Sequence, residues 1–193
     1  LNSMKFALAG KVNNLLVLGL ALTMIAYVII AFVSGAWDGS TLVPFFTQGS
    51  GGSTGFLAMV PTAMTGYGSI VAMAFMVSEV KNPNKNVPKS VLIAMIIVLC
   101  LYLGIILATV GMVSAQFLMD NPGMQFIPLY AAAFTKLASI PWVSKLISVA
   151  ALLALLTTML TVMSLTSRAI QAAADKGLMP EGLAKNNKAG VPF

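Results

Sequence analysis

The residues Thr65-Gly66-Tyr67-Gly68-Ser69 combine two glycines, two hydroxyl side chains and an aromatic ring near the centre of an apolar run. Glycine weakens a helix, and a helix that unwinds at membrane depth leaves backbone N–H and C=O groups without partners. Such groups, with the dipoles of the two helix ends, can hold the charged groups of a small molecule. Packing is the alternative, because small residues let two membrane helices approach closely. These residues alone leave both interpretations open.

A second polar set lies in a later apolar run, where Thr157, Thr161 and Ser164 are spaced i, i+4, i+7 and Thr158 lies beside them. This spacing places three hydroxyl groups on one stripe of a helix. The stripe could line a cavity or a cation site. Alternatively, each hydroxyl donates to a carbonyl one turn back in its own helix.

Enzyme chemistry is largely excluded by what the chain lacks. It has no histidine and one cysteine, Cys100, which lies among apolar residues and is interpreted as a packing residue. Its five acids are scattered through loops and the ends of apolar runs, so no catalytic triad, metal cluster or phosphate-binding loop is formed. We therefore predict no enzyme activity, no catalytic residue, no metal site and no cofactor. The five acids are Asp38, Glu79, Asp120, Asp175 and Glu181.

The elements that position these residues are predicted from the composition. Hydrophobic residues make up 59% of the 193 residues and charged residues only 8%, against roughly 25% charged in a soluble domain. Apolar runs of about 18 or more residues are candidates for membrane-spanning helices. The sequence therefore predicts a single all-α integral membrane unit over residues 1–193, surrounded by the lipid bilayer. Its four predicted spans cover residues 12–34, 56–80, 91–115 and 147–166.

The basic residues predict the orientation. Four spans divide the connecting segments into two alternating sets, and Lys and Arg concentrate in cytoplasmic loops. One set carries nine basic residues, and the other carries only Lys136 and Lys145. Both ends of the chain are therefore predicted to be cytoplasmic, in the cell membrane, and the net charge of +6 needs no nucleic-acid partner. The first set is Lys5, Lys11, Lys81, Lys85, Lys89, Arg168, Lys176, Lys185 and Lys188.

The connecting segments carry three further predictions. Residues 126–139 are expected to form a short amphipathic helix over the outer surface, with Ile127, Tyr130, Ala131 and Phe134 on its apolar face. Pro88 is expected in the first turn of the third spanning helix, where its missing N–H costs nothing. Residues 168–193 are expected to form a polar, basic cytoplasmic tail.

Three short motifs resemble those of the amino acid–polyamine–organocation permeases. Residues 78–83 read SEVKNP, similar to that family's E-E-V-K-N-P signature after the sixth helix. Ser167-Arg168 and residues 174–180, ADKGLMP, are similar to its S-R and D-G-x-L-P motifs after the eighth. Residues 190–192, GVP, are similar to the G-x-P before the ninth. The order and spacing also agree, so the chain resembles helices five to eight of about twelve.

The resemblance implies a LeuT-type five-plus-five inverted-repeat fold with a discontinuous helix. It also implies secondary transport of amino acids by alternating access, with the substrate at the unwound centre of the 56–80 helix. The remaining helices of a full-length permease would then be partners of this segment. The substrate-binding residues that it implies are Thr65, Gly66, Tyr67, Gly68, Ser69 and Ile70.

Some positions depart from the family pattern. No acid follows the break, an additional lysine separates Asp175 from Gly177, and no lysine lies inside the first span. The coupling ion, H⁺ or Na⁺, is therefore left open, although the hydroxyl stripe would suit a sodium site.

The position of Glu79 suggests a cytoplasmic gate with Lys81 and Arg168. An ordinary interfacial ion pair is the alternative. A different class of protein also remains open, namely a four-helix membrane subunit that does not itself transport.

Overall fold

The computed structural model describes residues 6–43, 52–68, 77, 80–124, 127–180 and 182. Within these ranges the regular elements are all helices, which confirms the all-α prediction. Three of them, α1 from Gly10 onward, α3 and α6, are long and apolar enough to cross a membrane. The elements are α1 (Phe6–Val33), the 3₁₀ turn η1 (Gly39–Leu42), α2 (Gly52–Thr65), α3 (Pro83–Val110), α4 (Ala115–Asp120), α5 (Pro128–Thr135) and α6 (Trp142–Asp175).

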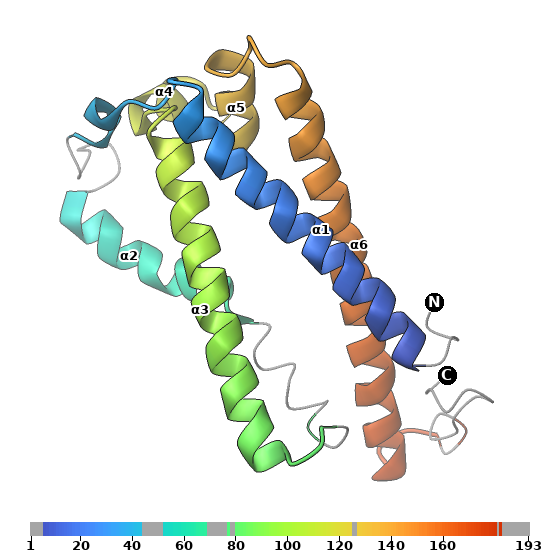
Figure 1. Ribbon diagram of the computed structural model, residues 1–193. Helices are drawn as coiled ribbons and strands as arrows, with labels where there is room; N and C mark the ends of the chain where they lie inside the picture. Colours follow the sequence, from blue (N-terminus) through green and yellow to red (C-terminus); the bar gives the residue numbers. More distant parts are fainter. Residues whose placement is uncertain are drawn as a thin grey trace.

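Helix α1 runs diagonally and packs against both α3 and α6 (Figure 1). Glycines lie at both crossings. A Cβ at Gly19 would lie 3.4 Å from Leu153 of α6, and a Cβ at Gly104 of α3 would lie 3.5 Å from Val28 of α1. The missing side chains let the backbones approach, as is usual between membrane helices. Helix α1 therefore links α3 to α6 along their length, and α5 also contacts both at one end.

The buried core lies at the end of the molecule where α1 and α3 meet and where α4 and α5 lie across them (Figure 1). Elsewhere many large apolar side chains of the long helices are exposed, as expected for surfaces that face lipid or further helices. The core consists of Tyr27, Ala31, Ala108, Met112, Val113, Ala131, Ala132, Ala133, Leu137, Val143 and Ile147.

Helix α3 begins at Pro83, so the prediction that Pro88 lies in its first turn is wrong. Asn82 adopts a left-handed conformation with φ 51° and ψ 60°, and its carbonyl accepts the N–H groups of Lys85 and Asn86. Pro83 occupies the first helical position, where proline is favoured. Pro88 lies inside the helix, where it cannot donate to the carbonyl of Asn84.

Helix α6 is 34 residues long, about 50 Å at 1.5 Å per residue. It is therefore longer than the hydrocarbon core of a bilayer, which is about 30 Å thick. Residues 168–175 therefore form its last two turns rather than the start of a tail. Gly177 ends the helix with φ +72°. The N–H of Leu178 bonds the carbonyl of Ala173 at 2.9 Å, and that of Gly177 bonds Ala174 at 3.0 Å. These two hydrogen bonds form a Schellman motif. The motif needs a residue in the left-handed conformation, which explains why a glycine follows Lys176.

Helix α5 is shorter than the predicted 126–139 segment, and the face it buries includes Ala131, as expected, but neither Ile127 nor Phe134. Ala131, Ala132 and Ala133 are buried, whereas Phe134 and Ile127 are exposed by 60% and 46%. Small side chains permit the close contact of α5 with α6 and α3, and this contact decides which face is buried.

Candidate functional site

The continuous described part of the second predicted span, residues 56–68, ends at Gly66-Tyr67-Gly68. Helix α2 stops at Thr65, and the N–H groups of Gly66 and Tyr67 bond carbonyls three residues back, Ala63 at 3.2 Å and Met64 at 3.0 Å. The Thr65 hydroxyl donates to the Thr62 carbonyl at 2.6 Å. Three-residue bonds are typical of the tightened last turn of a helix. The backbone thus leaves regular α-helical geometry at Gly66.

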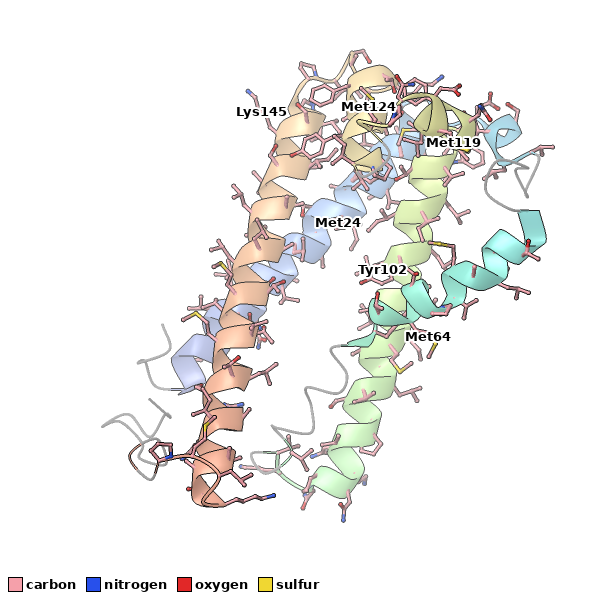
Figure 2. All side chains as sticks on the ribbon, turned by 180° about the vertical axis from the view of Figure 1, so that it is seen from behind. Met24, Met64, Tyr102, Met119, Met124 and Lys145 are labelled. Atoms are coloured by element: carbon pink, nitrogen blue, oxygen red, sulfur yellow. The ribbon has the colours of Figure 1, made fainter. Side chains whose placement is uncertain are left out.

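A tyrosine of α3 lies against this helix end. The rings of Tyr67 and Tyr102 meet edge to face, with centroids 6.1 Å apart and an interplanar angle of 69°. A Cβ at Gly66 would lie 3.5 Å from Cε2 and 3.9 Å from the hydroxyl oxygen of Tyr102. Figure 2 shows Tyr102 beside the end of α2 that carries Met64. The two rings of Tyr67 and Tyr102 therefore lie together beside Gly66, at the end of α2.

The sequence analysis did not identify Tyr102. Its signal was a single tyrosine near the middle of the apolar 91–115 run. Nothing in that run indicates which of its residues faces Gly66, because the contact depends on how α2 and α3 cross.

Two of the predicted substrate-binding residues, Ser69 and Ile70, lie outside the described residues. The other four, Thr65 to Gly68, lie together at the end of α2, where Gly68 has no described atom within 4 Å of its would-be Cβ. A side chain could therefore be added at Gly68 without displacing any described neighbour.

The hydroxyl stripe lies on α6, and the hydroxyl groups of its three threonines bond carbonyls of their own helix. Thr157 and Thr158 both donate to the Ala154 carbonyl, at 2.9 Å and 2.8 Å, and Thr161 donates to the Thr157 carbonyl at 2.8 Å. Thr157 is buried and Ser164 is half-buried. These bonds agree with the alternative that the hydroxyl groups bond carbonyls of their own helix. The role of the stripe in a cation site or a cavity stays a prediction.

The predicted gate is only partly within the described structure. Lys81 is exposed just before α3, and Arg168 is half-buried on α6. Glu79 lies outside the described residues, so the pairing of these three charges stays a prediction.

The chain belongs to the amino acid permease family, because the model of that family matches residues 2–193. This agrees with the resemblance seen in the sequence motifs. It also agrees with the prediction that the protein is a transporter rather than an enzyme.

Two curated relatives have the same name, branched-chain amino acid permease BcaP. The one from Bacillus subtilis (strain 168) is 27% identical over 180 residues, covering 91% of this chain and 35% of the relative. The one from Lactococcus lactis subsp. cremoris (strain MG1363) is 26% identical over 192 residues, covering 95% and 39%. This chain thus spans little more than a third of the length of these relatives. No solved structure matches it.

Proposed function

We propose that the full-length permease carries amino acids across the cell membrane by alternating access, with both ends of this segment on the cytoplasmic side. The observation that carries the proposal is the end of α2 at Thr65, inside an apolar run and against Tyr102. Irregular backbone at membrane depth is tolerated only where it is buried in protein or lines a cavity. Transporters of this class bind substrate at such breaks.

The substrate's charged groups would bind backbone N–H and C=O groups of Thr65 to Ile70. Its side chain would contact the rings of Tyr67 and Tyr102. An apolar, branched side chain fits such a surface, and both relatives are named as permeases for branched-chain amino acids. We therefore propose leucine, isoleucine and valine as the first substrates to test.

The test uses Gly68→Ala in the full-length permease. Because no described atom lies within 4 Å of a Cβ there, packing against the described residues predicts no effect, whereas a substrate-binding backbone predicts about a tenfold rise in KM for leucine uptake. Gly10→Ala in α1 is the matched control, since its Cβ also meets nothing within 4 Å. Gly66→Leu and Gly68→Leu should abolish uptake while the protein still reaches the membrane. Unchanged kinetics in all three variants at positions 66 and 68 would overturn the proposed site.

The role of Tyr102 is tested separately. Tyr102→Phe keeps the ring and should keep the preference for leucine over alanine, whereas Tyr102→Ala should reduce it. Leu103→Ala removes an equally exposed neighbour on the same helix and should leave the preference unchanged. An unchanged preference in Tyr102→Ala would remove this residue from the site.

The proposals for the coupling ion and for the cytoplasmic gate rest on the sequence alone. Uptake measured with and without sodium, and with and without a pH gradient, separates Na⁺ from H⁺ coupling. If the hydroxyl stripe binds Na⁺, Thr161→Val should weaken sodium dependence. If Glu79 gates with Lys81 and Arg168, Glu79→Gln should change the uptake rate or its pH dependence.

The alternative, a four-helix subunit without transport of its own, is less well supported. The family match runs along residues 2–193, and the curated relatives are permeases that continue well beyond the matched region. A full-length protein that reaches the membrane and carries no amino acid in a complete panel would favour this alternative.

A further inference from the structure

The segment that follows α1 folds across the C-terminal end of α3 and bonds it at three points. The N–H of Asp38 donates to the Gly111 carbonyl at 2.8 Å. The Thr41 hydroxyl shares its one hydrogen between the Val110 carbonyl at 2.8 Å and the Asp38 carbonyl at 2.7 Å. The indole Nε1 of Trp37 donates to the Leu107 carbonyl at 2.9 Å. The last carbonyls of a helix have no partner within the helix. Residues 37–41 supply partners for the carbonyls of Val110 and Gly111. The Leu107 carbonyl also accepts the N–H of Gly111, at 3.0 Å, so the indole adds a second bond there. Residues 37–41 therefore cap the end of α3.

Gly111 is required at this contact for space rather than for backbone freedom. Its φ of −69° and ψ of −15° suit any residue. However, a Cβ at this position would overlap the Trp37 indole at Nε1, Cδ1 and Cε2. The ring of Phe32 lies 5.4 Å from that of Trp37, centroid to centroid. The indole is therefore held between Phe32 and the end of α3.

Helix α1 itself is joined to α3 below this cap. The Tyr27 hydroxyl and Thr109 Oγ1 lie 2.9 Å apart, and both residues are buried. Val28 lies against Gly104 one further turn along α3. We call the set of contacts between residues 27–41 and residues 104–111 the α1–α3 joint. It combines backbone bonds, side-chain bonds and buried apolar packing at one end of two long helices.

The contact between α2 and α3 is of a different kind. It consists of the ring contact of Tyr67 with Tyr102 and the approach of Gly66. The residues of α2 from Phe56 to its end at Thr65 are exposed, as is Gly66. Helices that slide or rotate do so where few specific bonds must break.

We propose that the α1–α3 joint stays closed in every state of the permease, so that α1 and α3 move as one body at this end. Substrate-linked motion then occurs at the α2 contact, away from the joint. The mechanical part of this inference rests on the proposed transport function. Opening the joint would expose the carbonyls of Val110 and Gly111 together with a buried core, and the described residues show no other donor to these two carbonyls. The Leu107 carbonyl would lose the Trp37 indole and keep the Gly111 N–H.

The test is a reversible cross-link at the joint, in the full-length permease with Cys100→Ala. Trp37→Cys and Gly111→Cys are combined, because the indole that would collide with a side chain at Gly111 is removed at the same time. The Cδ1 atom that such a side chain would overlap is only two bonds from the Cβ of Trp37. The two Cβ atoms therefore lie near the separation of about 3.5–4.5 Å that a disulfide needs.

Cross-linking is measured first, in native membranes, and needs no transport. A joint that is always closed predicts nearly complete disulfide formation under mild oxidation, with or without leucine. Little cross-linking, or cross-linking that leucine lowers severalfold, would overturn the proposal.

Uptake is then compared between the oxidised and reduced forms of the same double variant. The proposal predicts rates within about twofold of each other, since locking a joint that never opens changes nothing. A loss of tenfold or more that reduction restores would refute it. If the double variant cross-links as predicted while the parent permease carries no amino acid, the proposed function fails and the closed joint stands.

Discussion

The buried hydroxyl pair between Tyr27 and Thr109 gives a prediction with a definite order of effects. Thr109 Oγ1 donates to the Ile105 carbonyl at 2.7 Å. A hydroxyl has one hydrogen, so the bond of 2.9 Å between Tyr27 and Thr109 must be donated by Tyr27. The two bonds therefore form a directional chain from Tyr27 through Thr109 to Ile105. Removing its first member and removing its second member have different consequences.

Tyr27→Phe removes only the donor at the start of the chain. Thr109 keeps its bond to Ile105, so the cost is one hydrogen bond within the membrane, about 0.6 kcal/mol. Thr109→Val removes the acceptor and leaves the Tyr27 hydroxyl, 1% exposed, without a partner. A buried unsatisfied hydroxyl costs about 1–3 kcal/mol. The double variant removes both groups and should be more stable than Thr109→Val alone.

The measurement is unfolding of the purified full-length permease in detergent, by heat and by titration with a denaturing detergent. Thr109→Ser is the control, because it keeps the hydroxyl and should retain the bond to Tyr27. If Tyr27→Phe destabilises the protein as much as Thr109→Val, or if the double variant shows the sum of both effects, the direction of the chain is wrong.

Three further predictions concern contacts of α1 and its following segment. Gly111→Ala should destabilise the protein by displacing the Trp37 indole, and a Trp37→Ala/Gly111→Ala double variant should be no less stable than Trp37→Ala alone; additive losses in thermal unfolding would contradict this. The pKa of Asp38 is held below its ordinary value by hydrogen bonds from the Ser40 N–H and the Ser40 side chain, and by the charge of Lys136. The stabilising effect of Asp38 should therefore be present above about pH 4 and be lost as the pH falls below that. Asp38→Asn should flatten this acid limb of the unfolding temperature, and an unchanged limb would show that other groups cause it. Gly19→Val should weaken the contact with Leu153, 3.4 Å from its would-be Cβ, whereas Gly19→Ala should be nearly neutral; equal losses in detergent stability would argue against a crossing at this glycine.

The helix end at the proposed site could be predicted from the sequence because its signals are local. Two glycines inside a long apolar run indicate where a helix can break, and α2 does end at Thr65. The permease motifs at residues 78–83 and 174–180 indicate the family, which the match over residues 2–193 shows. The glycine at 177 also has a local explanation, since it ends α6 in a left-handed conformation.

Other features could not be predicted because they depend on residues far apart in the chain. The bond between Tyr27 and Thr109 spans 82 positions, and that between Trp37 and Leu107 spans 70. The long apolar parts of α1 and α3 are hydrophobic on all sides, so no periodic pattern indicates which of their faces meet. The error at Pro88 is of the same kind, because the turn at Asn82 decided where α3 begins.

The sequence by itself determined that the chain is an all-α membrane segment of the amino acid permease family, because composition, span length and short motifs are properties of neighbouring residues. Only the tertiary structure decided that Tyr102 faces Gly66 and that Gly111 must leave room for Trp37. Those contacts follow from the way the long helices cross. In an apolar chain, helix crossings depend on the fit of glycines and side chains across the interface rather than on any contrast of polarity along one helix.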